Sequence, residues 1–205
     1  MAITNYTNLQ TSIADFLNRD DLTSVIPTFI SLAEAQMNRD LRHWRQQRRV
    51  TTTLNQQFEN MPSDMVEPTH LYIDTTHGEK TLEFASLAEI SRRKLRKAGI
   101  TGEPVVFTMN SGQFEFVPAP DDSYDLTMVY YSRVDSLSAT ITTNWVLEYH
   151  PDIYLYGAAF HAAVYLNDPA AQQAYATMYS AAIQQANLES DKAIHSGGPL
   201  VMRNR

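Results

Sequence analysis

The sequence predicts an α+β fold in which N- and C-terminal helices pack as a helical bundle, with a central β-rich insertion and a flexible C-terminal tail. Apolar residues recur at helical spacing near both ends of the chain, β-branched residues alternate in the middle, and glycines interrupt the last segment. The predicted segments are an N-terminal helical hairpin at 1–46, a β-rich insertion with one short helix at 47–140, C-terminal helices packing on 1–46 at 141–194, and a flexible tail at 195–205.

Two helices are predicted in the N-terminal segment. The first covers about residues 8–18, where apolar residues recur at helical spacing after a capping box at Thr7–Gln10. The second carries one apolar face from Ile26 to Trp44. Pro27 fits its first turn, where the missing N–H costs little.

The pattern changes to that of strands at Arg49, where β-branched residues alternate with polar ones. Hairpin turns are predicted at His77-Gly78 and Ser111-Gly112, because each glycine can take the positive φ that a tight turn requires. The longest predicted strand runs over 124–133, with alternate residues on one buried face.

Helix signals occur inside and after the β region. A second capping box, Ser86–Glu89, opens a short helix that Gly99 can close in the left-handed conformation. Helical spacing returns with Pro151 at a first turn, and Asp168-Pro169 starts a last helix over about 169–192.

The composition is that of a globular protein, with 43% hydrophobic and 19% charged residues. The net charge of −7 disfavours a dedicated nucleic-acid binder. The absence of cysteine excludes disulfides, zinc fingers and a cysteine nucleophile, and only 7 glycines disfavour Gly-rich phosphate loops. We identify no secretory leader or membrane-spanning stretch, so we expect a protein made in the cytoplasm that does not contact membranes.

No catalytic residue, cofactor or metal site is predicted. No two of the six histidines have the three- or four-residue spacing that places two metal ligands on one helical face. A glycosidase could use two carboxylates held about 5 to 9 Å apart, and an acidic solvated turn is the simpler interpretation of the same residues. The carboxylates in question are Glu115, Asp121, Asp122 and Asp125.

Basic residues gather in two short clusters, at 39–49 and at 92–97. The first cluster is our candidate for a partner-facing surface, because its three-residue spacing would align guanidinium groups along a helix and its exit. Such a row suits an acidic protein or a phosphate, whereas a solvated helix end is the alternative. The cluster consists of Arg39, Arg42, Arg45, Arg48 and Arg49.

Two further groups are candidates for contacts. Tyrosines beside small residues in the C-terminal helices indicate a subunit contact or a helical core, and they include Tyr154, Tyr165, Tyr175 and Tyr179. In the tail, Leu200–Met202 cannot bury themselves in a free chain end, so they indicate a partner groove, with ordinary terminal disorder as the alternative.

Several motifs occur in an order that is similar to one protein family. They are Ile26–Arg42, Met61–Met65, Val117–Pro120, Tyr130-Tyr131, Thr143–Leu147 and His150–Ala158. In this order they resemble the head-to-tail adaptor proteins, also called head completion or connector proteins, of tailed bacteriophages, especially the short-tailed type. The similarity spans about residues 5–188 and carries no catalytic residues with it.

The resemblance implies a structural virion protein at the head–tail interface, assembled in the host cytoplasm. About twelve copies would form a ring under the portal protein and provide the docking surface for the tail or nozzle protein, while DNA passes through without specific binding. A C-terminal extension often reaches the portal in such adaptors, which makes the tail the candidate portal-binding segment. Its residues are Gly198, Pro199, Leu200, Val201, Met202, Arg203 and Arg205. The alternatives are a virion-associated cell-wall hydrolase with a Glu/Asp pair, and a tail tube or nozzle subunit.

Overall fold

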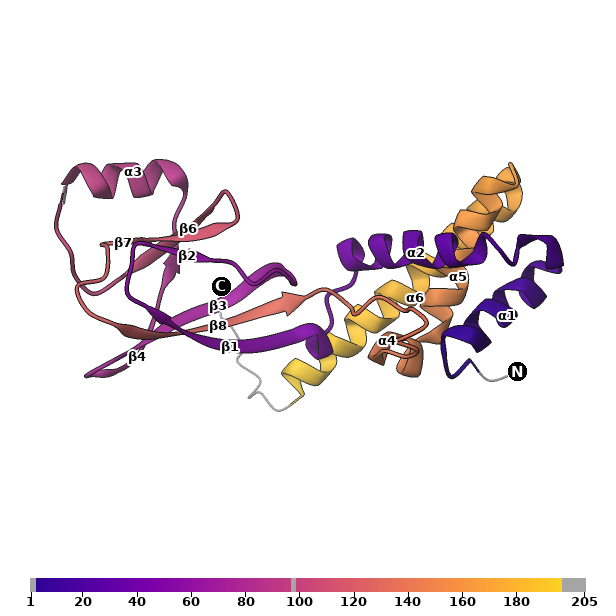
Figure 1. The fold of residues 1–205 in the computed structure, drawn as a ribbon, viewed down its shortest axis with the longest axis horizontal. Coiled ribbons are helices and arrows are strands. Elements are labelled where there is room, and N and C mark those ends of the chain that lie inside the picture. The colour runs from indigo at the N-terminus through magenta and orange to yellow at the C-terminus, as the bar shows by residue number, and fades with distance from the viewer. Residues whose placement is uncertain (1–2, 97–98, 197–205) are drawn as a thin grey trace, which may run out of the picture. The chain divides into compact units, whose positions relative to one another are not determined.

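The structure, a computed structural model, describes residues 3–96 and 99–196 of the chain. Its contacts divide the chain into a helical unit, Met1–Gln46 with Arg133–Arg205, and a β unit, Gln47–Ser132 (Figure 1). Helices and sheets are both present, as the α+β prediction requires. Residues 133–140, which the sequence assigned to the β-rich insertion, belong to the helical unit.

The helical unit is built from five α-helices and two 3-10 turns within the described residues. They are α1 (Tyr6–Leu17), η1 (Asp20–Leu22), α2 (Ile26–Asp40), η2 (Trp44–Gln46), α4 (Trp145–Tyr149), α5 (Pro151–Tyr165) and α6 (Pro169–His195). Prolines occupy the first turns of α2, α5 and α6, as the sequence predicts. The short α4 was not predicted.

The helix starts follow local capping chemistry. Asn5 caps α1, since its side chain accepts a hydrogen bond from the Asn8 amide at 2.8 Å, so the predicted capping box at Thr7 is wrong. Asp168 caps α6 and accepts from the amides of Ala170 and Ala171, as its place before Pro169 indicates.

The end of α2 at Asp40 differs from the prediction of a helix that reaches Trp44. Two side chains of α6 satisfy the backbone there. Asn187 accepts from the Arg42 amide and Ser190 accepts from the Trp44 amide, both at 2.9 Å. These bonds replace intrahelical ones, so the chain leaves the helix at Leu41 and turns into η2.

The segment 133–143 contacts α2 through two backbone amides, for which α2 offers side-chain acceptors. Asn38 accepts from the Val134 amide at 2.8 Å, and Glu34 accepts from the Leu137 amide at 2.7 Å. The Asn38 carboxamide and the Glu34 carboxylate both belong to α2, so these two side chains hold the segment on the helical unit.

The core of the helical unit lies around α5, which packs against α1, α2, α4 and α6. Small residues line α5, and a Cβ added at Gly157 would lie 3.0 Å from the Ala33 Cβ and 3.3 Å from the Tyr179 ring. This close approach explains why the polypeptide uses glycine in the middle of a helix, where it otherwise weakens the helix. The largest fully buried side chains here are Leu9, Ile13, Ile26, Ile30, Met37, Leu41 and Tyr154.

In its described residues, the β unit contains two four-stranded sheets and one helix. Its elements are β1 (Gln47–Leu54), β2 (Phe58–Asn60), β3 (Met65–Thr75), β4 (Gly78–Thr81), β5 (Glu83–Phe84), α3 (Leu87–Arg96), β6 (Val106–Asn110), β7 (Gln113–Val117) and β8 (Tyr124–Ser132). The first sheet has the order β1-β8-β3-β4 and is antiparallel, and the second has the order β2-β7-β6-β5 with β5 and β6 parallel.

The two predicted hairpin turns are present. Ser111 and Gly112 have φ values of 52° and 78° between β6 and β7, as a type I′ turn requires. Thr75 pairs with Gly78 between β3 and β4, and Gly78 takes a φ of 110°. The second turn therefore lies one residue earlier than His77-Gly78.

The layers of the β unit follow from strand alternation. Phe114 and Phe116 of β7 point into a core shared by both sheets, whereas Val117 points into a smaller core with Ile90 of α3. Thus α3 covers the outer face of the second sheet (Figure 1). Its residues Arg92 and Arg96 are exposed, whereas Arg93 and Lys94 are half-buried.

Candidate interaction surfaces

The end of α2 carries the first three arginines of the candidate cluster. Arg39 is exposed in the last turn. Arg42 donates from Nη1 to the carbonyl oxygens of Arg39 at 3.2 Å and of Leu41 at 2.7 Å. Arg42 thus stabilises the carbonyl end of α2, which is the local role that a cation has at a helix C-terminus.

Arg45 lies between two aromatic side chains. Its guanidinium carbon is 4.6 Å from the centre of the Trp44 ring and 3.9 Å from that of Tyr149. Trp44 and Tyr149 are 40% and 49% exposed, so this stack forms part of the surface. We call Trp44, Arg45 and Tyr149 the stacked surface. Tryptophan, tyrosine and arginine are the residue types that dominate binding energy at protein interfaces.

The last two arginines of the cluster belong to the β unit. Arg48 forms an ion pair with Asp64 at 2.8 Å, and Arg49 donates to the hydroxyl of Tyr72. The predicted row along a helix and its exit thus holds only for Arg39, Arg42 and Arg45, because α2 ends at Asp40 and Arg48 and Arg49 lie in β1.

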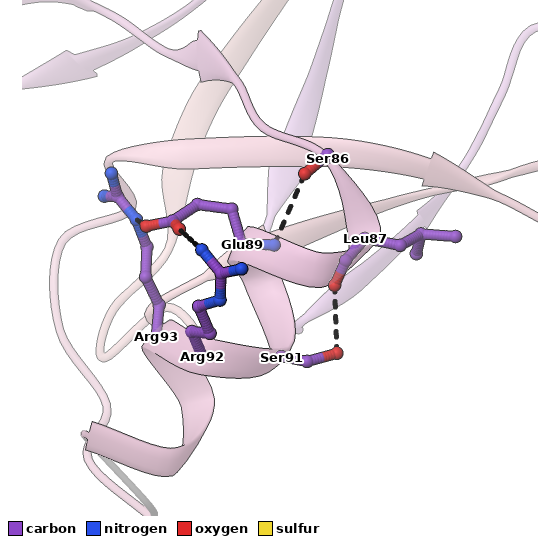
Figure 2. Close-up of polar contacts among 6 residues, drawn as sticks. All are labelled: Ser86, Leu87, Glu89, Ser91, Arg92 and Arg93. Atoms are coloured by element: carbon purple, nitrogen blue, oxygen red, sulfur yellow. Dashed lines mark hydrogen bonds and ion pairs between the residues drawn. The ribbon is translucent and has the colours of Figure 1, made fainter.

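The second basic cluster lies on α3, which begins after Ser86 as predicted, with the serine half of the predicted capping box present. Ser86 accepts from the Glu89 amide at 3.4 Å, and the Glu89 carboxylate contacts Arg93 at 3.0 Å and Arg92 at 3.7 Å (Figure 2). Figure 2 shows both guanidinium groups converging on this one carboxylate beside the first turn of the helix. Leu95, on the same helix, is 82% exposed.

A groove of about 610 Å³ borders α3 in the β unit. Ser91, Lys94 and Leu95 line it from the helix, and Pro118 and Ala119 line it from the segment after β7. The half-buried Lys94 and the exposed, apolar Leu95 thus lie side by side here, which is a common composition for a protein contact.

The candidate tyrosines have two different environments. Tyr154 and Tyr179 are buried in the helical unit, and the Tyr154 hydroxyl lies 2.6 Å from Asn144 Nδ2 and 3.2 Å from Glu34 Oε1. Burial raises the pKa of both phenols. They are core residues, so a subunit contact through them is wrong. Tyr165, 58% exposed, and the half-buried Tyr175 remain accessible.

The acidic residues around 118–120 have separate local partners. Glu115 is buried on β7, where it forms an ion pair with Lys94 of α3 and accepts from Gln57 at 3.3 Å. Asp121 accepts from the hydroxyl of Tyr124 at 2.7 Å, and this bond raises the pKa of Tyr124 to about 12. The hydrolase alternative gains no specific support from these positions. Asp122 and Asp125 are exposed.

The candidate portal-binding residues lie outside the described part of the chain. They are Gly198, Pro199, Leu200, Val201, Met202, Arg203 and Arg205. Among the described helices, none has both the length and the apolar character needed to cross a lipid bilayer.

The fold and these surfaces define a class of protein. Two units with their own cores present stacked arginine and aromatic side chains, a basic helix and exposed apolar residues, which are features by which a structural protein contacts other proteins. A family model described as SU10 adaptor protein matches residues 4–203, nearly the whole sequence. The chain therefore belongs to the SU10 adaptor protein family, which confirms the resemblance to phage head-to-tail adaptors. This family is structural rather than enzymatic, and its members are virion components. Curated proteins yield no match to the chain.

Proposed function

We propose that this protein is the head-to-tail adaptor of a short-tailed phage, that it forms a ring of about twelve copies under the portal, and that this ring provides the docking surface for the tail or nozzle protein. The family match over residues 4–203 is the observation that carries the proposal. Copies would assemble in the host cytoplasm and remain at the head–tail interface of the virion.

Contacts between neighbouring copies would use the accessible tyrosines. Tyr165 packs against Phe29 at 5.6 Å between ring centres and is still 58% exposed, so a neighbour can bury the rest of its ring. The stacked surface would meet the portal or the tail, because its aromatic rings hold the Arg45 guanidinium in place and a fixed side chain loses little entropy on binding.

The net charge suits a channel through which DNA moves. Each copy carries −7, so a ring of copies would repel phosphates, provided that its arginine clusters face partner proteins rather than the channel. A reconstruction of the virion in which Arg39, Arg42 and Arg45 line the DNA channel would contradict this assignment.

The C-terminal residues are the proposed portal anchor. Leu200, Val201 and Met202 are apolar and are followed by Arg203 and Arg205, so together they could fill an apolar groove with an acidic rim.

Deletion of residues 196–205 tests this anchor. The truncated protein should keep its circular dichroism spectrum and lose co-sedimentation with assembled portal particles. A Lys192→Ala variant, altered at an exposed position of α6, is the matched control and should bind like the wild type. Unchanged binding of the truncated protein would refute the anchor while leaving the family membership intact.

A further inference from the structure

Three side chains of the kind that bind metal ions meet inside the helical unit, from three separate segments. His43 lies between α2 and η2, His150 lies between α4 and α5, and Glu189 lies on α6. One possible ligand atom from each residue lies within 4.8 Å of the other two, and His150 Nε2 is 4.0 Å from a carboxylate oxygen of Glu189. The sequence spacing of the histidines gave no indication of this cluster, because the ligands do not share one helix.

His43 is the central member of the cluster. Its side chain is completely buried, and its Nε2 has no hydrogen-bond partner among the residues that the structure describes. The ring stacks on Trp145 with centres 4.9 Å apart and meets the His150 ring edge-on at 5.7 Å. A buried nitrogen without a partner is rare, because leaving one costs about 1–3 kcal/mol. Because Nδ1 accepts from the Arg45 amide, Nε2 carries the ring proton in the metal-free protein, and it can bind a metal ion once this proton has moved.

Burial, together with the neighbouring His150, lowers the pKa of His43 to about 4. Glu189 supplies a negative charge at the open side of the cluster, where its side chain is 64% exposed.

We propose that His43, His150 and Glu189 form a binding site for Zn²⁺. Two imidazole nitrogens and one carboxylate oxygen are an established zinc ligand set, and a water molecule can complete the tetrahedron on the side where Glu189 meets solvent. In a tetrahedral site with bonds of about 2.0–2.2 Å the ligand atoms lie about 3.4 Å apart, so the three side chains need only a small contraction. The exposed Glu189 can make most of this movement by changing its rotamer.

Zinc binding would change one hydrogen bond. The Arg45 amide donates to His43 Nδ1 at 3.2 Å. With Zn²⁺ on Nε2, the ring proton of neutral His43 must lie on Nδ1, so this long bond is lost and the turn at 43–46 adjusts. The amide resonance of Arg45 is therefore expected to shift strongly on zinc binding, although Arg45 is not a ligand.

A zinc ion at this site would link three parts of the helical unit to one another. The turn after α2, the junction of α4 and α5, and the last third of α6 would be joined by one ion, directly beside Arg45 and the stacked surface. Zinc would then stabilise the surface that we propose as a partner contact, without any part in a chemical reaction. This inference does not depend on the proposed ring.

Calorimetric titration of the untagged full-length chain with ZnCl2 at neutral pH tests the site. We expect saturable binding of one Zn²⁺ per chain, a raised melting temperature, and no binding of MgCl2, since Mg²⁺ prefers oxygen ligands. The informative variants are Glu189→Gln and His150→Gln, because neither removes the completely buried His43. Each should weaken zinc binding by about tenfold or more.

Two matched controls separate the site from weak surface binding. Glu148→Gln changes an exposed carboxylate on α4, and His77→Gln changes an exposed histidine in the β3–β4 turn, so both should bind Zn²⁺ like the wild type. The proposal is overturned if the wild type shows no saturable binding at micromolar Zn²⁺, or if the Glu189 and His150 variants bind as tightly as these controls.

Discussion

Glu34 is a buried carboxylate on α2 whose partners lie far away in the sequence. It accepts hydrogen bonds from the Leu137 amide, 103 residues later, and from the Tyr154 hydroxyl, 120 residues later. The sequence shows Glu34 beside the apolar face of a helix but contains no signal for these acceptor roles, because they arise only when the segment 133–143 packs on α2. The same is true of His43, whose neighbours come from two other elements.

Substitutions of Glu34 separate its hydrogen bonds from its charge. Glu34→Ala leaves two buried donors without an acceptor and should lower the free energy of unfolding by about 2–4 kcal/mol. Glu34→Gln keeps an acceptor oxygen and removes the cost of a buried charge, so it should stay within about 1 kcal/mol of the wild type at neutral pH. Urea unfolding followed by circular dichroism measures both differences.

The pH dependence of the same variants has a definite sign. Burial raises the pKa of Glu34 above its usual value of 4.5. The folded protein therefore binds the proton more tightly than the unfolded chain, so this contribution to stability is full below 4.5 and is lost as the pH rises through the folded pKa. Wild type should gain stability relative to Glu34→Gln as the pH falls from neutral towards 4.5. A Gln variant as unstable as the Ala variant at neutral pH would contradict this account.

At the scale of elements, the sequence correctly predicted those helix starts and turns that neighbouring residues determine. The proline positions, the helix start at Ser86 and the turn at Ser111-Gly112 were correct because a few neighbouring residues specify them. The end of α2, the five-residue α4 and the parallel pairing of β5 with β6 were missed. The end of α2 and the pairing of β5 with β6 depend on partners from distant segments, which periodicity cannot show. Helix α4 has a local signal that was overlooked, because Asn144 caps it by accepting from the Leu147 amide.

The contact that holds α3 on the second sheet can be tested by substitution. Lys94 pairs with Glu115, which is only 4% exposed and whose other hydrogen bond comes from Gln57. Lys94→Ala removes the cation that pairs with this buried carboxylate. We expect the free energy of unfolding to fall by about 1–3 kcal/mol, since Lys94 itself is partly solvated. Arg92→Ala removes a pair at the surface and should cost about 0–1 kcal/mol.

Two spectroscopic signals locate the effect of Lys94→Ala. Both tryptophans of the chain, Trp44 and Trp145, lie in the helical unit, so their fluorescence reports unfolding of that unit. Circular dichroism reports both units. We expect Lys94→Ala to shift the circular dichroism transition in urea and to leave the fluorescence transition in place. Equal shifts in both signals, or no shift in either, would contradict a local role for this ion pair.

At the scale of the whole molecule, the α+β class and the adaptor family were predicted from the sequence, and the family match over residues 4–203 confirms the second. The assignment of contact residues was less successful. Tyr154 and Tyr179 proved to be core residues, because small and aromatic side chains at helical spacing serve a helical core as well as an interface. Which surfaces meet partners depends on the assembled virion, and one chain does not encode that in a local pattern.

The central claim is that this protein adds a ring to the portal. The most direct measurement is cryo-electron microscopy of purified portal particles mixed with an excess of the full-length protein. We expect an additional ring of density with about twelve copies on one face of the portal, into which both units of the chain can be fitted. Portal particles that remain bare at saturating concentrations of the folded protein would contradict it.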